Sequence, residues 1–179
     1  PLVTFALFAY NQEQYIREAV EGAFSQTYEP LEIILSDDCS KDNTYKIMRN
    51  LAEKYRGPHS VRLNRCPINL GTAAHVSTVF SLSRGKLFVV AAGDDISGKE
   101  RVTKIVSAWN AQGQPPALIH SAMIQFEEGV GNDITLLPAK KRSLKSICSL
   151  EQFVVEWRMP ARGPTCAYSR DIFERFPQL

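Results

Sequence analysis

The stretch Lys86-Leu87-Phe88-Val89-Val90-Ala91-Ala92-Gly93-Asp94-Asp95 joins an apolar run to two adjacent carboxylates. The apolar run is typical of a buried strand, so the acidic pair falls at the carboxyl end of that strand. A carboxylate there is costly unless a positive charge neutralises it, and a divalent cation that holds a phosphate is one candidate. The alternative, about even on this stretch alone, is a loop in which one aspartate caps a helix that starts near Lys99.

The same pattern occurs earlier, where the apolar run 31–36 ends in Asp37-Asp38. A loop rich in capping residues follows, and Asp42 is the better candidate for the cap of the helix that starts at Thr44. Asp38 is then available to accept hydrogen bonds from a base or a ribose. Another apolar run, 2–9, ends at Tyr10, an aromatic residue that either stacks on a nucleobase or packs in the core.

Strands and helices alternate over the first hundred or so residues. This order predicts an α/β fold with a Rossmann-like, mostly parallel central sheet and helices on both faces. In such sheets ligands bind beyond the carboxyl ends of the strands, where Tyr10, Asp38 and Asp95 fall. The predicted strands are 2–9, 31–36, 61–64 and 87–92, and the predicted helices are 15–24, 44–54, 73–82 and 100–111.

The remaining residues are less regular, and we expect one domain over 1–179. The predicted elements are a strand at 117–121 that continues through 123–126, a Gly-rich turn at 127–133, an exposed loop at 136–149, a helix at 150–157, a strand within 161–170 and a helix at 171–176, with Asp171 as its N-cap.

Charge and cysteine content exclude several classes of protein. The formal net charge is +2 and the basic residues are scattered, which argues against nucleic acid as a partner. The four cysteines are widely spaced with no CxxC pair, which favours buried reduced thiols in a cytosolic protein over zinc ligands or disulfides. No apolar run is long enough to span a bilayer, so we expect a cytoplasmic protein, peripheral at most at the inner face of a membrane. His75 and His120 are interpreted as packed or surface residues and His59 as a loop residue.

Several ordered motifs together resemble family 2 glycosyltransferases with a GT-A fold. They include the Asn-x-Gly turn at Asn69-Leu70-Gly71 and the Gly-x-apolar-Asp-Asp segment that ends at Asp95. The resemblance is close over about the first 110 residues. The matching segments are 5–16, 23–28, 32–44, 69–71, 85–95 and 163–173.

The resemblance implies a role for each matched residue. Asp38 is expected to bind uracil or another base, and the end of the first strand to line the nucleotide pocket, together with Gly71 of the turn. Asp94 is expected to contact the ribose or the metal, and Asp95 to ligate Mn²⁺ or Mg²⁺ on the diphosphate. The expected pocket-lining residues of the first strand are Phe8, Ala9 and Tyr10.

The implied activity is that of a hexosyltransferase-type enzyme that transfers a sugar with inversion. The donor is a nucleotide-diphosphate sugar, with a UDP-sugar favoured, and the acceptor is a hydroxyl of a sugar, a lipid-linked sugar or a polysaccharide. Residues 1–110 are expected to bind the donor, and 111–179 to form a partial acceptor-side half, truncated at the C-terminus. No Glu-Asp pair lies between residues 162 and 179, so the catalytic base is expected beyond Leu179.

Two other functions stay open on the sequence. A metal-dependent nucleotidyltransferase uses a similar sheet, although its usual Gly-rich, Arg-containing loop after the first strand is replaced here by residues 10–14. A degenerate, non-catalytic module that binds nucleotide or sugar is the second. It is left open by Phe8 and Ala9, which stand where the family often has hydroxyl residues, and by the missing base.

Overall fold

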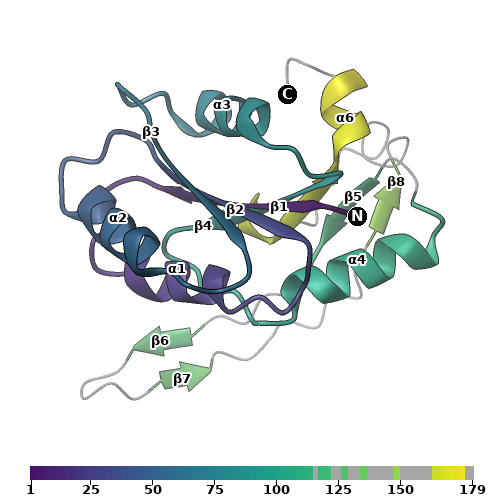
Figure 1. Cartoon of the computed structure of the whole chain (residues 1–179), viewed down its shortest axis with the longest axis horizontal. Coiled ribbons are helices and arrows are strands. Elements are labelled where there is room, and N and C mark those ends of the chain that lie inside the picture. Colours follow the sequence, from purple (N-terminus) through teal and green to yellow (C-terminus); the bar gives the residue numbers. More distant parts are fainter. Residues whose placement is uncertain (115–116, 122–125, 129–133, 137–146, 150–162, 176–179) are drawn as a thin grey trace.

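A seven-stranded sheet forms the centre of the chain (Figure 1). The computed structural model describes residues 1–114, 117–121, 126–128, 134–136, 147–149 and 163–175. The strand order is β3-β2-β1-β4-β9-β5-β8. The first four of these strands are mutually parallel, whereas β9 runs antiparallel to both of its neighbours. The strands are β1 (Val3–Ala9), β2 (Leu31–Asp37), β3 (Ser60–Arg65), β4 (Leu87–Ala92), β5 (Ala117–His120), β8 (Ile147–Ser149) and β9 (Cys166–Ser169).

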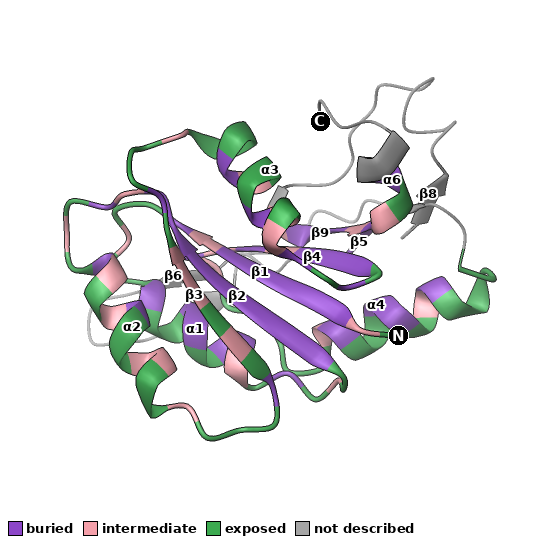
Figure 2. Ribbon diagram, turned by 45° about the horizontal axis from the view of Figure 1, so that its top comes forward, coloured by how far each residue is buried: buried purple, intermediate pink, exposed green. Residues whose placement is uncertain are grey.

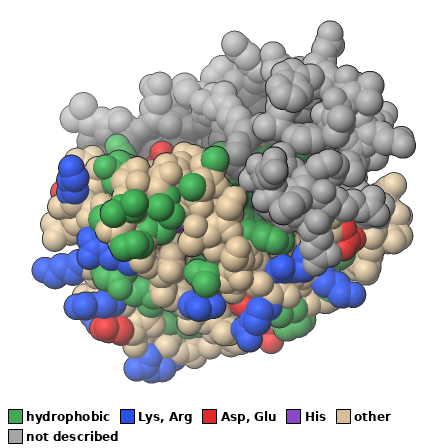
Figure 3. Space-filling view, turned by 90° about the horizontal axis from the view of Figure 1, so that it is seen from above, with side chains coloured by type: hydrophobic (Ala, Val, Ile, Leu, Met, Phe, Trp, Pro, Cys, Tyr) green, Lys and Arg blue, Asp and Glu red, His purple; other side chains and the backbone are tan. Residues whose placement is uncertain are grey.

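Helices cover both faces of this sheet, as the alternating pattern predicts. Helices α1 (Ile16–Phe24), α2 (Thr44–Lys54) and α4 (Arg101–Ala111) lie on one face, and α3 (Thr72–Leu82) and α6 (Arg170–Arg175) lie on the other (Figure 1). No helix in the described residues has the length and apolar character needed to cross a bilayer. The face that carries α3 shows dispersed Lys and Arg side chains over its described part (Figure 3).

Alternation along β1 divides the core between these two faces. Val3, Phe5 and Leu7 pack toward α1, α2 and α4 in the larger cluster of buried side chains, whereas Ala6 packs with Val79 of α3 in the smaller one. All of these residues are fully buried, and β1, β2 and β4 are buried along almost their whole length (Figure 2). Strands buried on both faces carry continuous apolar runs, which explains why the sequence pattern locates them.

Most predicted elements are confirmed within two residues, and the helix 44–54 and the strand 87–92 match in full. The less regular part of the chain, after about residue 126, differs from its prediction. The predicted loop 136–149 is wrong at its ends, because Ile147–Ser149 forms β8 against β5 and Leu136 ends β7 (Ile134–Leu136). The predicted turn 127–133 begins inside β6 (Phe126–Glu128), which pairs with β7. A three-residue strand is too short to show a period, and only its partner stabilises it.

The structure corrects one predicted helix cap and refines the prediction for His59. Asp171 is not an N-cap, because α6 already starts at Arg170. His59 is 7% exposed, and its Nε2 lies 2.8 Å from the carbonyl oxygen of Gln26. It is therefore a loop residue, as predicted, that lies directly before β3 and is packed against the rest of the chain. The predicted helix 150–157 lies outside the described residues.

Candidate active site

A pocket of about 350 Å³ opens where β1, β2 and β4 end. This is the carboxyl edge of the parallel strands, the usual position of ligands in such sheets. All of the predicted nucleotide-binding residues except Asp94 line this pocket. Its walls are formed by Phe8, Ala9, Tyr10, Gln12, Asp38, Asn69, Gly71, Thr72, His75 and Ala92.

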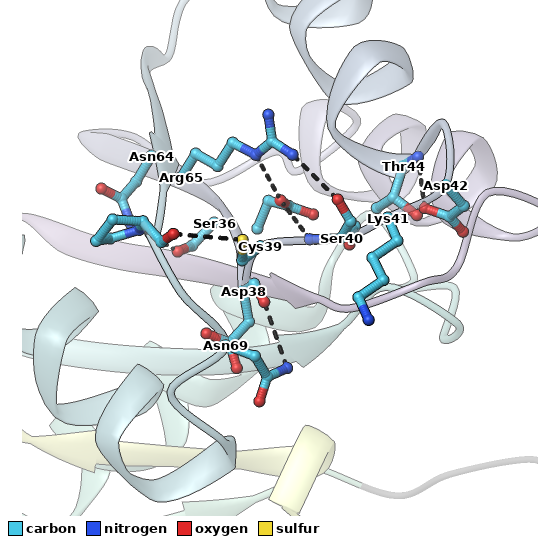
Figure 4. Close-up of polar contacts among 12 residues, drawn as sticks. Ser36, Asp38, Cys39, Ser40, Lys41, Asp42, Thr44, Asn64, Arg65 and Asn69 are labelled. Carbon is cyan, nitrogen blue, oxygen red and sulfur yellow. Dashed lines mark hydrogen bonds and ion pairs between the residues drawn. The ribbon is translucent and has the colours of Figure 1, made fainter.

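Asp38 ties the end of β2 to the Asn-x-Gly turn. The carboxylate is 3% exposed, and it accepts hydrogen bonds from the backbone N–H groups of Leu70 at 2.8 Å and Gly71 at 3.0 Å. The Asn69 side chain donates to the Asp38 carbonyl at 3.4 Å (Figure 4). Gly71 has a φ of +75°, a conformation that favours glycine. Each carboxylate oxygen keeps a further lone pair that a ligand in the pocket can use.

Asp37 and Asp42 hold the loop beside the pocket. The Asp37 carboxylate accepts a hydrogen bond from the backbone N–H of Ser40 at 3.0 Å and forms an ion pair with Arg65 at 3.3 Å. Arg65 also donates to the Ser40 carbonyl (Figure 4). The N-cap position of α2 is Asn43, one residue after the predicted cap, but Asp42 Oδ1 accepts the backbone N–H of Thr44 at 2.9 Å and so satisfies a donor of the first helical turn. Partial burial acts to raise the pKa of Asp42, but hydrogen bonds led by those from Thr44 outweigh it and lower the pKa.

The acidic turn after β4 is more open than the pocket floor. Asp94 is exposed and Asp95 is half-buried, and neither lines the pocket, although Ala92 two residues earlier does. The N-cap position of α4 is Glu100 and has no side-chain cap, so the capping alternative for the acidic pair is not observed. Oxygen ligands on an accessible turn suit a hard divalent cation, and the pair therefore fits Mn²⁺ or Mg²⁺.

Gly93 seats this turn directly on β1. Its backbone N–H donates to the Phe8 carbonyl at 2.8 Å. A Cβ atom at this position would lie 3.0 Å from the Ala9 Cβ, 2.9 Å from the Ile16 Cδ1 and closer still to the Gln12 amide oxygen. Only a glycine allows this approach without displacing neighbours, so the acidic turn is held beside the pocket.

Gln26 fixes the segment between the acidic turn and α4. Its buried side chain donates to the carbonyls of Gly22 and Gly98, both at 2.9 Å, and accepts the backbone N–H of Val102 at 3.1 Å. The next backbone N–H, of Thr27, donates to the Lys99 carbonyl at 2.9 Å. The family-matching segment 23–28 thus has a structural role that its sequence pattern did not reveal.

Arg101 connects this region to the antiparallel part of the sheet. Its guanidinium donates to the carbonyls of Val90 at 2.8 Å and Pro164 at 2.7 Å, and to the hydroxyls of Ser97 and Ser121. Pro164 lies in the short 3₁₀ helix η1 (Gly163–Thr165) that precedes β9. Burial lowers the pKa of Arg101 to about 10, a value at which the side chain is still positively charged near pH 7, and the charges of Cys166 and Asp95 oppose this shift.

Comparison with known proteins agrees with this geometry. Residues 4–176 match the family described as Glycosyl transferase family 2. The chain belongs to that family. An uncharacterized protein of Mycobacterium bovis is 32% identical over 123 residues, which are 68% of this chain and 35% of that protein. The putative glycosyltransferase EpsE of Bacillus subtilis is 29% identical over 139 residues, 78% of this chain and 49% of that protein. The chain thus spans a third to a half of these relatives.

Solved structures confirm the GT-A type of fold. A mannosyltransferase of Pyrobaculum calidifontis, solved with GDP-Man and Mn²⁺, has a TM-score of 0.70 at 20% identity, over 97% of this chain and 46% of that one. TarS of S. aureus, solved with UDP, has a TM-score of 0.65 at 18% identity, over 98% and 48% of the two chains.

His75 is one of the pocket residues to which the sequence analysis assigns no role in this family 2 chain. The sequence interpretation, a packed or surface residue, is confirmed by its 3% exposure, but the residue also lines the pocket. One ring nitrogen lies 2.6 Å from the Ser36 hydroxyl, and the ring meets Phe8 edge-on. Burial lowers its pKa, against the opposing charges of Asp38 and Asp37. The sequence did hold one signal that His75 could lie in the pocket. The residue comes only four positions after Gly71, on the first turn of α3.

Proposed function

We propose that this chain is the donor-binding part of a glycosyltransferase. It would transfer a hexose from a nucleotide-diphosphate sugar, with a UDP-sugar favoured, to an acceptor hydroxyl with inversion, in polysaccharide, cell-wall or glycolipid synthesis. The observation that carries the proposal is the pocket at the carboxyl edge of β1, β2 and β4, lined by Asp38 and adjoined by the acidic turn. Residues 1–110 would bind the donor, and residues 111–179 would contribute to the acceptor side.

In this proposal the pocket residues bind and orient the nucleoside. Asp38 would accept hydrogen bonds from the base through the lone pairs that Leu70 and Gly71 leave free. Tyr10 is 42% exposed at the pocket, so its ring is available for stacking on the base. Phe8 and Ala9 would form the apolar floor, and the backbone of Gly71 would allow close approach of the ligand.

The acidic turn would hold the metal and the diphosphate. Asp95 would ligate Mn²⁺ or Mg²⁺, and Asp94 would contact the metal or the ribose. A bound divalent cation would neutralise charge on the departing diphosphate as a Lewis acid. The GDP-Man and Mn²⁺ bound to the Pyrobaculum mannosyltransferase support this assignment, as does the UDP bound to TarS.

The proposed place of action is the cytoplasm, at the inner face of the membrane where the acceptor is lipid-linked. Support comes from Cys39 and Cys66, two described cysteines that form no disulfide, because reduced thiols are typical of reducing compartments.

Calorimetric titration of UDP and GDP, each with and without Mn²⁺, tests the proposal. We expect Mn²⁺ to tighten binding of one nucleotide to the wild-type chain, and Asp95→Ala to remove this metal effect. A matched control is Glu53→Ala, which changes an exposed carboxylate on α2 and should leave the metal effect intact. Release of the nucleotide diphosphate from a panel of UDP- and GDP-sugars then identifies the donor.

Two results would contradict the proposal. One is nucleotide binding of equal strength with and without Mn²⁺, which would remove the metal from the mechanism. The other is binding of an oligosaccharide together with no binding of any nucleotide, which would favour a non-catalytic sugar-binding module.

A further inference from the structure

We propose that Asp38, Cys66 and His75 form a second cation site, for a thiophilic divalent metal such as Zn²⁺. One potential ligand atom from each residue lies within 4.8 Å of the other two. Each of the three residues is only 3% exposed. The set is distinct from Asp94 and Asp95 of the acidic turn, and the proposed transfer reaction makes no use of Cys66.

The three ligands come from neighbouring elements whose positions are fixed by the backbone. Asp38 follows β2 and Cys66 follows the adjacent strand β3, where the Cys66 N–H donates to the Asp37 carbonyl at 2.9 Å. His75 lies on the first turn of α3, and its N–H donates to the Gly71 carbonyl at 2.9 Å. Gly71 is itself hydrogen-bonded to the Asp38 carboxylate. The cluster is therefore preorganised in the free protein.

Uncompensated negative charge favours a cation at this place. Asp37 is fully buried, and its Oδ1 has no hydrogen-bond partner. Arg65 is paired with the other oxygen of Asp37, whereas the Asp38 carboxylate is in contact with neutral donors, which are the backbone N–H groups of Leu70 and Gly71 and the Cys66 thiol. Within the described residues, the ion pair with Arg65 thus neutralises only part of the charge of two adjacent buried carboxylates. Buried charge of this kind is costly until it is neutralised.

The protonation state of Cys66 responds to such a cation. Burial raises the pKa of the Cys66 thiol, and the charges of Asp38 and Asp37 raise it further, so the metal-free residue is a neutral thiol near pH 7. A bound divalent cation reverses the local field, and a coordinating thiol loses its proton to solvent as the metal–sulfur bond forms.

The donor set selects the class of metal. One sulfur, one imidazole nitrogen and one carboxylate oxygen suit Zn²⁺, whereas Mg²⁺ and Mn²⁺ prefer oxygen ligands. Bond lengths of about 2.0–2.3 Å around a tetrahedral ion separate its ligands by about 3.3–3.8 Å, so shifts of about 1 Å close the cluster. Asp38 and His75 also line the pocket, which gives the ion an entry path and an open fourth position.

Titration of the metal-free chain with Co²⁺, in the absence of nucleotide, tests this site directly. We expect a thiolate-to-cobalt charge-transfer band in the near ultraviolet and intense visible bands of a tetrahedral ion, both abolished when Zn²⁺ displaces Co²⁺. Cys66→Ser should remove the charge-transfer band, and His75→Gln should weaken Zn²⁺ binding by at least about tenfold. Circular dichroism checks that both variants fold.

Two other cysteines provide matched controls. Cys39→Ser and Cys166→Ser remove thiols outside the cluster, and both variants should keep the band. X-ray absorption at the zinc edge of the wild-type chain should find one sulfur neighbour without any substitution. The proposal is overturned if the wild-type chain shows no charge-transfer band, if the band survives in Cys66→Ser, or if zinc has no sulfur neighbour. None of these readouts depends on sugar transfer.

Discussion

The two Asp-Asp pairs follow strands that flank β1 on either side, yet their surroundings are opposite. Asp37 and Asp38 are 0% and 3% exposed and are bonded to the protein, whereas Asp94 is exposed and Asp95 half-buried. The neighbouring strand explains the difference. Strand β3 pairs with β2 as far as Asp37, and the segment after it covers the first pair. Strand β9 pairs with β4 only up to Val89, so within the described residues the last part of β4 has no strand partner on that side and lies beside the short helix η1 instead. A sequence pattern places a carboxylate at an edge, and the neighbouring strand determines whether it stays accessible.

Of the substitutions that test the contrast between the two Asp-Asp pairs, Asp95→Asn is expected to have the largest effect, and this effect is on catalysis. Loss of the carboxylate charge removes metal ligation, and we expect kcat/KM for transfer to fall by about 100-fold or more, equivalent to about 2.7 kcal/mol. The free energy of unfolding should change by less than about 0.5 kcal/mol, as for most accessible positions. Steady-state kinetics and urea denaturation of the same preparation give both numbers. A large loss of stability would place Asp95 among structural residues.

In contrast to Asp95→Asn, the Asp38→Asn substitution is expected to have a large effect on the stability of the fold. The amide nitrogen would face one of the two backbone N–H groups that Asp38 now accepts, leaving a buried donor unpaired. We expect the free energy of unfolding to fall by about 2–3 kcal/mol, measured by urea denaturation. Asp94→Asn is the control and should change it by less than about 0.5 kcal/mol. Equal effects in both variants would refute the contrast between the pairs.

Arg101→Lys tests how the open pair is held in place. Lysine keeps the charge but cannot reach the carbonyls of Val90 and Pro164 and the Ser97 hydroxyl at once. We expect about 2 kcal/mol of lost stability in thermal or urea unfolding, and a lower kcat with little change in nucleotide affinity. Arg49→Lys, on the surface of α2, should be nearly neutral. An Arg101→Lys variant as stable as wild type would exclude this positioning role.

Gly93→Ala is expected to have the smallest effect of the four. The new Cβ would crowd Ala9 and Ile16, at a cost of about 1–2 kcal/mol. Gly98→Ala is the matched control, because a Cβ there meets nothing within 4 Å, and its stability should stay within about 0.5 kcal/mol of wild type. Differential scanning calorimetry of the pair measures the difference. Unchanged stability of the Gly93→Ala variant would mean that the acidic turn is not pressed against β1.

The parallel half of the fold could be predicted from sequence because its signals are local. Continuous apolar runs mark strands buried on both faces, and capping residues such as Asp42 mark helix starts. In the antiparallel half, strands were predicted at 117–121 and within 161–170, where β5 and β9 lie. Their order could not be predicted, because β9 enters between β4 and β5 from far along the chain, and β8 was missed because it has only three residues. The pocket lining followed from strand ends. The roles of Gln26 and Arg101 did not, since each depends on contacts between residues distant in sequence.

Gln26 has a consequence for motion. Its side chain and the adjacent backbone anchor the segment from Gly98 to Val102 at both ends, and Gly93 is anchored on β1 at the other side of the acidic turn. Adjustment of the turn on ligand binding is thereby concentrated in residues 94–97. Amide hydrogen exchange should accordingly be fast at Asp94 and slow at Val102. The boundary between fast and slow exchange is therefore expected to fall within this short segment. The chain thus carries a short hinge, one limit of which is set by a glutamine that is more than seventy residues away in the sequence.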